Sequence, residues 1–228
     1  MRSSVDEFPA QTSTREWAGA LLLVAVGGYG DAASFLLVGC FTGHTTGNSV
    51  LAAIALARGG RVWEPILAVV CFLCATALAQ RLRTSSTQPF GSRGVHYVLG
   101  AEMLLVFVSP FLLMAQHRYA FIACMSLALG LQNGAVSRAD GISLHTTYLT
   151  GTLTRLLSLL VQPGSANVSM NKSEMRFIPL VWGAFVAGAL CGALTIARVG
   201  PRGVWGMPVL LGTVLGISSL EQRAGKAG

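Results

Sequence analysis

The stretch GGYGDAASFLLVGCFTGHTTGNSVLAAIALA, residues 27–57, places polar side chains within or beside segments that are apolar enough to enter a bilayer. These polar residues are Asp31, Thr42, His44, Thr45, Thr46 and Asn48. A second stretch, GLQNGAVSRADGISLHTTYLTGTLTRLLSLL, residues 130–160, repeats the theme later in the chain. The remaining segments read as an apolar scaffold around these two polar stretches.

The composition indicates a membrane protein that crosses the bilayer several times. Of the 228 residues, 53% are hydrophobic and 11% are charged, against about 25% charged in soluble domains. The mean hydropathy is +0.61, and several apolar runs are long enough to span. The net charge of +7 comes from Lys and Arg that lie almost entirely between the apolar runs, as the positive-inside bias places them. No basic stretch is interleaved with aromatic residues, so we expect no nucleic-acid binding.

We also expect no cofactor and no metal. All five cysteines fall in apolar runs, and the CxxC at Cys71 and Cys74 has no His or acidic residue nearby. Small side chains that pack inside a helix explain these cysteines better than redox or metal chemistry. Catalytic motifs such as HExxH, GxSxG or a Gly-rich phosphate loop do not occur, so we expect no enzyme activity.

The apolar segments follow the order long, short, long, long, and this order occurs twice. The predicted organisation is a cytoplasmic tail (1–16), membrane repeat one (17–116), membrane repeat two (117–218) and a C-terminal tail (219–228). A shift of 104 residues preserves the segment order and aligns the two polar stretches, with Thr42 on Thr146 and Thr46 on Thr150. A rival shift of 101 matches the two HTT triplets but loses the glycine before the polar core. Tandem internal repeats are typical of secondary transporters.

Two topologies remain open because the short segments are ambiguous. The segment 46–57 is too short to cross about 30 Å of hydrocarbon at about 1.5 Å per residue. Either it borrows the preceding polar run and the chain has eight spans, or it is a half-helix and the chain has six spans plus two half-helices. The six-span scheme puts about ten basic residues inside and five outside, a stronger bias than eight spans give. We therefore favour an all-α protein of the cell membrane with six spans, two short half-helices and both termini in the cytoplasm.

Three sequence blocks resemble the YoaK-like family of bacterial integral membrane proteins (DUF1275). They are GYGDAASFLLVGCFTGHTTGNSVL, LALGLQNGAVSR and TTYLTGTLTRL. They carry an Asp in the first helix (Asp31), a TGN motif (46–48), a GLQN motif (130–133) and a TTYxTGTLT motif (146–154). The resemblance covers nearly the whole chain. It implies a multi-pass membrane fold and a membrane location, and it implies nothing about a substrate.

The polar residues in the apolar segments are the candidates for binding a solute or an ion. A charged group at the bilayer centre costs at least about 2.5–3.5 kcal/mol, so Asp31 and Glu102 each need a partner or a purpose. His44 could share a proton with Asp31. The Thr and Asn side chains either bond within and between helices or line a polar site near two half-helix N-termini. The full candidate set is Asp31, Thr42, His44, Thr46, Asn48, Glu102, Gln132, Asn133, Thr146, Thr150 and Thr152.

The sequence thus favours a secondary transporter or exporter of a small polar or amphipathic solute, coupled to an ion or to protons. The alternative is a non-transporting membrane component that binds a lipid or a protein partner, and a membrane-embedded enzyme is less favoured. The partners that we expect are the lipid bilayer and an unidentified small solute or ion. The small-residue faces at Gly183, Gly188 and Gly192 and at Gly212 and Gly216 suit either intramolecular packing or a homo-oligomer.

Overall fold

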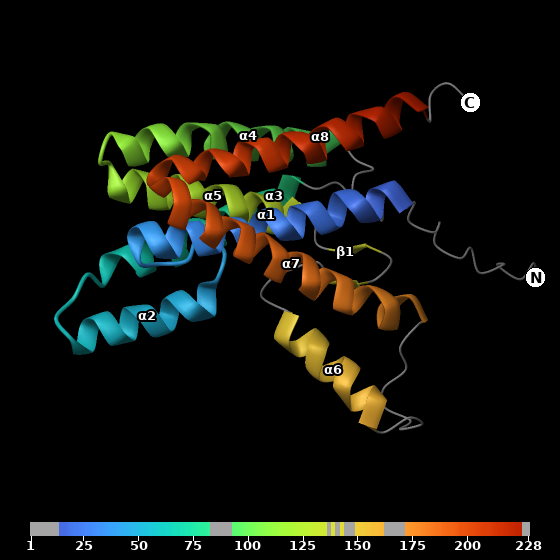
Figure 1. Ribbon diagram of the computed structural model, residues 1–228, viewed down its shortest axis with the longest axis horizontal. Helices are drawn as coiled ribbons and strands as arrows, with labels where there is room; N and C mark the ends of the chain where they lie inside the picture. The colour runs from blue at the N-terminus through green and yellow to red at the C-terminus, as the bar shows by residue number, and fades with distance from the viewer. Residues whose placement is uncertain are drawn as a thin grey trace, which may run out of the picture.

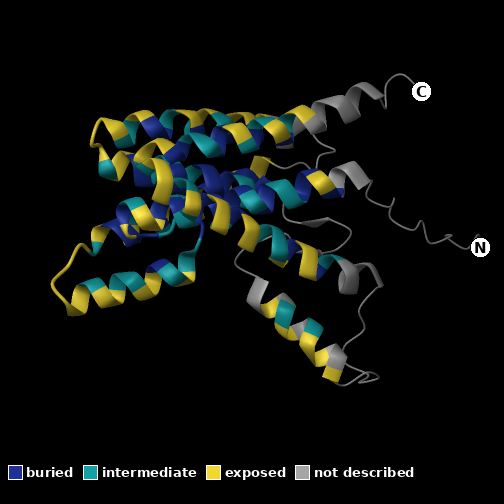
Figure 2. Ribbon diagram, in the orientation of Figure 1, coloured by how far each residue is buried: buried dark blue, intermediate teal, exposed yellow. Residues whose placement is uncertain are grey.

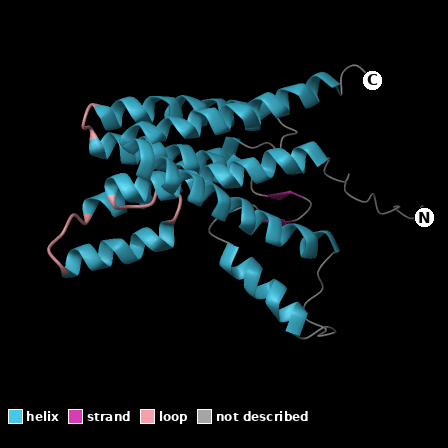
Figure 3. Cartoon of the chain, in the orientation of Figure 1, coloured by secondary structure: helices cyan, strands magenta, loops and turns pink. Residues whose placement is uncertain are grey.

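The computed structural model describes residues 14–82, 93–135, 138–139, 142–143, 149–161 and 172–224, and these form helices almost throughout (Figure 3). The helices are α1 (Thr14–Val38), α2 (Thr45–Ala57), α3 (Trp63–Leu82), α4 (Arg93–Met114), α5 (Arg118–Ala135), α6 (Leu149–Val161), α7 (Lys172–Val199), the 3-10 helix η2 (Gly200–Trp205) and α8 (Gly206–Ala224). Two strands of two residues each, β1 (Arg138–Ala139) and β2 (Ile142–Ser143), pair antiparallel. The predicted all-α class is confirmed apart from this short pair.

The helices follow the predicted apolar runs closely. The predicted short segment 46–57 is α2, which begins one residue earlier, and the second short segment is α6. The first helix extends three residues into the predicted tail, because α1 begins at Thr14. Positive φ angles at Gly39, Gly59 and Gly200 follow the ends of α1, α2 and α7, where a left-handed residue commonly terminates a helix.

Among the described residues, four stretches are long and apolar enough to cross a membrane. They are Trp17–Val38, Trp63–Leu82, Tyr97–Met114 and Phe177–Gly216. The last stretch covers 40 residues and contains most of α7, all of η2 and the first part of α8, since the turn at Gly200 does not interrupt its apolar character. This pattern is that of a polytopic membrane protein.

The long helices run back and forth along the length of the molecule (Figure 1). Helices α1, α4 and α7 run in one direction, and α3, α5 and α8 run in the other. The two short helices diverge from this bundle. In this view α2 and α6 both begin near the middle of the molecule and run outward in opposite directions.

The buried residues gather where α1, α3 and α5 overlap, and the outer helix faces are exposed (Figure 2). Many of the exposed side chains are large and apolar, among them Leu36, Leu56, Val70, Leu104 and Val209. A soluble monomer rarely exposes so much contiguous apolar surface, whereas a bilayer solvates it. The outer faces are therefore those of helices that meet lipid.

Two helix crossings hold the middle of the bundle together through glycines. In the α1–α7 crossing, Gly28 faces the backbone of Phe185, and a Cβ added at Gly188 would come within 2.0 Å of the Ala25 carbonyl oxygen. In the α3–α5 crossing, a Cβ at Gly130 would come within 2.4 Å of the Phe72 carbonyl oxygen. Only glycine permits backbones to approach this closely, which is the small-residue packing of membrane helices.

Most pairs of packed helices form a matched set; the weakly packed pair α3–α4 has no comparable α7–α8 counterpart among the described residues. Helix α1 packs on α7 and α3 packs on α5; α4 packs on α5 and α1 packs on α8; α2 packs on α3 and α6 packs on α7. If α1, α2, α3 and α4 are exchanged with α5, α6, α7 and α8, respectively, each pair becomes the other pair named with it. The pair α1–α7 becomes α5–α3, α4–α5 becomes α8–α1, and α2–α3 becomes α6–α7. The pairs α4–α8 and α1–α5 also pack together, and each maps onto itself under the same exchange.

Candidate functional site

Asp31 lies in the second half of α1 and is 4% exposed. Its carboxylate accepts two backbone hydrogen bonds through one oxygen, Oδ1. The donors are the N–H groups of Thr42, at 3.0 Å, and Gly43, at 2.6 Å. The other oxygen, Oδ2, is buried and has no hydrogen-bond partner among the described residues. One half of the carboxylate therefore holds the chain after α1, and the other half is unsatisfied.

The loop between α1 and α2, residues 39–44, folds back against α1 and is pinned by side chains on both sides. The amide of Asn48 brackets Phe41, since its Oδ1 accepts from the Phe41 N–H (2.9 Å) and its Nδ2 donates to the Phe41 carbonyl oxygen (2.7 Å). The hydroxyls of Ser34 and Thr42 lie 3.2 Å apart. The Phe41 ring stacks on Phe35 with centroids 4.8 Å apart. These contacts satisfy backbone groups of the loop that lie outside any helix.

A small cavity of about 20 Å³ lies beside Asp31, between α1, α3 and α5. Its lining residues are Ala20, Leu23, Val24, Gly27, Asp31, Gly43, Phe72, Leu129, Gln132 and Asn133. The Gln132 amide donates from Nε2 to the Leu23 carbonyl oxygen at 2.9 Å, and its Oε1 is buried without a partner among the described residues. A cavity of this size has room for one water molecule.

The structure brings some of the predicted site residues together. Asp31, Gln132 and Asn133 line the cavity, although the last two lie about a hundred residues after the first along the chain. Thr42 and Asn48 are buried and hold the loop in place. Their role here is to fix the backbone, so they contribute to the site by positioning Gly43 and Asp31.

Other predicted site residues lie apart from the cavity. His44 is half-buried just before α2 and makes no capping hydrogen bond there, and its ring packs at 5.6 Å from that of Phe41. Thr46 is exposed on α2. Glu102 is fully buried on α4, and neither of its carboxyl oxygens has a hydrogen-bond partner among the described residues. Thr146 lies outside the described residues. Thr150 and Thr152 belong to α6, but their side chains lie outside the description.

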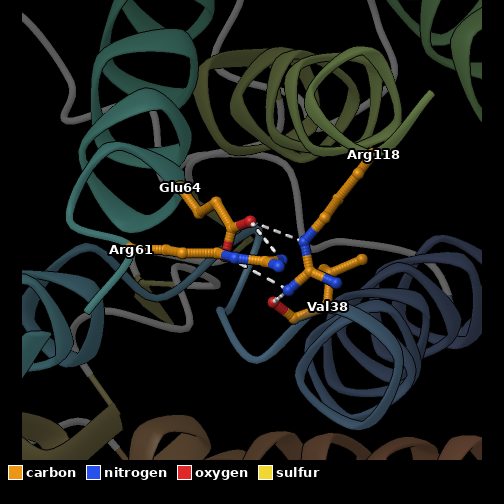
Figure 4. Close-up of polar contacts among 4 residues, drawn as sticks. All are labelled: Val38, Arg61, Glu64 and Arg118. Carbon is orange, nitrogen blue, oxygen red and sulfur yellow. Dashed lines mark hydrogen bonds and ion pairs between the residues drawn. The ribbon is translucent and has the colours of Figure 1, made fainter.

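An ionic cluster that the sequence analysis missed joins three helices at one end of the bundle (Figure 4). The Arg118 guanidinium donates to both carboxylate oxygens of Glu64, at 2.6 and 3.1 Å, and also to the carbonyl oxygen of Val38. Arg61 contacts the same carboxylate at 3.5 Å. The sequence contains one signal for this cluster, an acidic and a basic residue in the first turns of two apolar helices. The same two residues would fit equally well as separate charges near loops.

The described residues contain no group of three or more His, Cys, Asp or Glu side chains that could hold a metal ion. Cys40, in the loop after α1, is buried, and burial raises the pKa of its thiol to about 12. Its side chain is therefore a neutral packing group. The site can therefore recognise a ligand through two hydrogen-bond acceptors, Asp31 Oδ2 and Gln132 Oε1.

Comparisons with known proteins agree with this architecture. Residues 19–217 match the family described as protein of unknown function (DUF1275). The chain is 28% identical over 144 residues to the UPF0700 transmembrane protein YoaK of Bacillus subtilis (strain 168), an alignment that covers 60% of this chain and 63% of that protein. It is 24% identical over 215 residues to the UPF0700 transmembrane protein RA0705 of Rhizobium meliloti (strain 1021), covering 91% of this chain and 88% of that protein. No solved structure matches the chain.

The family match covers most of the chain, and it includes the Asp31 loop and the residues that line the cavity. Both relatives are named as transmembrane proteins, which agrees with the apolar helices of the bundle. The predicted resemblance is therefore confirmed: this chain is a transmembrane protein of the DUF1275 family and is similar to the transmembrane protein YoaK.

Proposed function

We propose that this protein is a secondary transporter or exporter of a small polar or amphipathic solute, coupled to an ion or to protons. It acts in the cell membrane with six spans, formed by α1, α3, α4, α5, α7 and α8, and with both termini in the cytoplasm. Helices α2 and α6 are half-helices that enter the bilayer and return. Asp31 is the coupling group, and the protein has no catalytic role.

The matched set of packed helices supports two repeats of inverted topology. Each unit, α1–α4 and α5–α8, contributes three long helices, so that an odd number of crossings turns the second unit upside down relative to the first. The exchange of partners between α1–α7 and α3–α5 is what a two-fold axis in the membrane plane produces. Inverted repeats of this kind give many transporters two alternative arrangements of nearly equal energy.

The length of the short helices supports the half-helix interpretation. Helices α2 and α6 each have 13 residues, which corresponds to about 20 Å at the helical rise, short of about 30 Å of hydrocarbon. Each helix begins near the middle of the molecule in Figure 1, so the positive ends of the helix dipoles lie toward the interior. Broken helices with this orientation surround the binding sites of several transporter folds.

The observation that carries the proposal is Asp31, a buried carboxylate that shares a cavity with Gln132. One of its oxygens has no hydrogen-bond partner within the described ranges of the chain. An ionisable residue inside a membrane bundle marks an ion or substrate path more often than a structural contact. The cavity touches both units, since Asp31 belongs to α1 and Gln132 to α5. A rocking motion of one unit against the other would therefore open it.

The test is whether water reaches the cavity from alternate sides of the membrane. In a variant without the five native cysteines, we would place a single cysteine at Val24, which lines the cavity, and probe it with an impermeant thiol reagent in vesicles of known orientation. The matched control is Val70→Cys on α3, which is 52% exposed on the outer face and is expected to lie in lipid. We expect labelling at position 24 that depends on the side of addition and changes with the ion gradient, and protection at position 70.

Uniform protection at position 24, beside well-labelled loop cysteines, would contradict transport. It would favour the alternative function, a non-transporting membrane component that binds a lipid or a protein partner, because such a protein keeps its polar interior dry. The exposed apolar sides of α2, at Val50, Ile54 and Leu56, give that alternative a surface to use.

A further inference from the structure

We propose that the cavity beside Asp31 is a binding site for one desolvated monovalent alkali cation, held between Asp31 Oδ2 and Gln132 Oε1. In the proposed transporter, the cation bound at this site is the coupling ion. Only this coupling role rests on the proposed function. The binding itself follows from the polar atoms, the charge and the volume of the cavity.

The hydrogen-bond pattern fixes which atoms the cavity presents. The Gln132 amide donates from Nε2 to the Leu23 carbonyl oxygen at 2.9 Å, and the reverse orientation would bring two acceptor oxygens together. Gln132 Oε1 is therefore the amide atom left over, and it is buried without a partner in the part of the chain that the structure describes, as is Asp31 Oδ2. Two unsatisfied acceptors beside one cavity require an occupant that is positive or that donates hydrogen bonds.

The charge and the volume of the cavity limit which ions or molecules can bind in it. Asp31 is the single acidic residue among those that line the cavity, and the lining contains no Lys or Arg. One positive charge balances the carboxylate, whereas a divalent ion would leave a net charge buried at high cost. A volume of about 20 Å³ holds one particle the size of a water molecule, which excludes a hydrated ion or an organic solute.

The same carboxylate links this site to the loop before α2. Asp31 Oδ1 accepts from the N–H groups of Thr42 and Gly43, and Gly43 also lines the cavity. A cation that fixes Oδ2 also fixes the orientation of Oδ1, so that occupancy and loop position are coupled. Binding of the ion should therefore protect the Thr42 and Gly43 amides from hydrogen exchange.

The experiment measures the thermal stability of the purified full-length protein in detergent at equal concentrations of sodium, potassium or choline chloride. The pH is kept the same in all three salts, because His44 and Asp31 interact electrostatically. At a tenfold excess over the dissociation constant, the bound cation should raise the Tm by about 3–6 °C relative to choline. The rise should saturate with concentration for the preferred ion and be smaller for the other.

Two variants identify the site, and one controls for a general loss of stability. Asp31→Asn keeps an acceptor for the Thr42 and Gly43 amides but places an NH₂ group where Oδ2 was, so the cation-dependent rise in Tm should disappear. Gln132→Leu removes Oε1 and should weaken the cation effect at least tenfold in apparent affinity. Glu64→Gln breaks the ion pair with Arg118 at the end of the bundle and changes no residue that lines the cavity, so it should lower the Tm in every salt and keep the difference between salts.

Equal Tm values in sodium, potassium and choline would overturn the proposal, since a single bridging water would then suffice for the two acceptors. A cation effect that survives in Asp31→Asn would overturn it as well. Either result would leave the alternating accessibility of position 24 untouched. Conversely, a cation effect that depends on Asp31 in a protein without side-dependent labelling would keep the binding site and reject transport.

Discussion

The α1–α7 crossing and the α3–α5 crossing use the same steric device but carry different side chains. In both, glycines on one helix face carbonyl oxygens of the other, as at Gly188 with Ala25 and at Gly134 with Thr76. The α1–α7 crossing is fastened at one end by the stacked rings of Trp17 and Phe177, whose centroids lie 3.9 Å apart. The α3–α5 crossing is fastened by an ion pair, Glu64 with Arg118.

This difference shows that the two crossings share their glycine packing but not their polar contacts. Helix α3 adds a further link, from the Thr76 hydroxyl to the Gly130 carbonyl oxygen at 3.1 Å. Gln132 then connects one crossing to the other through its bond to the Leu23 carbonyl oxygen. The polar groups of the cavity therefore lie at the junction of the two crossings.

The largest expected effect tests the steric device that both crossings share. Gly188→Leu forces a side chain against the Ala25 backbone, so the free energy of unfolding should fall by at least the upper end of the usual overpacking cost of about 1–3 kcal/mol. The measurement is unfolding of the detergent-solubilised protein by SDS titration. The matched control is Gly183→Leu on the same helix, where an added Cβ meets nothing within 4 Å. Equal losses in the two variants would contradict the close crossing.

The next prediction tests how much the Glu64–Arg118 ion pair, which the α1–α7 crossing lacks, stabilises the α3–α5 crossing. Glu64→Gln leaves the Arg118 charge without its carboxylate. Since the Arg118 side chain is 33% exposed, the expected loss of stability is about 2–3 kcal/mol, below that of a fully buried pair. The same SDS titration measures it.

Arg61→Gln is the control for the ion pair, because Arg61 is 69% exposed and lies 3.5 Å from the same carboxylate. It should change stability by less than about 0.5 kcal/mol. A loss as large as that of Glu64→Gln would mean that the overall charge of this end, rather than the Glu64–Arg118 pair, stabilises the crossing.

A smaller effect tests the loop that the first unit carries beside its crossing. Asn48→Ala leaves both the N–H and the carbonyl oxygen of Phe41 without their side-chain partner, so we expect a loss of about 1–3 kcal/mol, visible as a lower Tm. Ser49→Ala removes an exposed hydroxyl that bonds only to the Thr45 carbonyl oxygen of its own helix, and its Tm should stay unchanged. A stable Asn48→Ala variant would show that the Asp31 contacts alone hold the loop.

The smallest effect concerns Thr76, the polar link that is specific to the α3–α5 crossing. Thr76→Val removes one hydrogen bond to a carbonyl oxygen, and such bonds contribute about 0.6 kcal/mol on average in membrane proteins. Thr213→Val removes a bond within α8 at an exposed position and should change stability by less. Indistinguishable unfolding curves for the two variants would mean that the Thr76 hydroxyl does not stabilise the crossing.

The apolar runs predict the helices of this fold because burial in lipid requires continuous apolar segments with satisfied backbone. The length of α2 and the polar character of residues 42–48 were also readable, and they singled out Asp31 and Asn48. The sequence did not reveal which side chains contact each other. Glu64 and Arg118 lie 54 residues apart and look like ordinary charges at helix starts, and Asn48 looked like a ligand although it holds Phe41. Such contacts depend on the crossings, which no local pattern encodes.

The continuous apolar run Phe177–Gly216 has a consequence for how the protein enters the membrane during synthesis. The turn at Gly200 contains Pro201 and Arg202 but no polar loop. The insertion machinery therefore receives 40 residues with no hydrophilic loop between the two helices. We expect the insertion machinery to receive α7 and α8 together rather than one helix after the other. Because both helices pack on α1, the two would then reach the first helix in a single step.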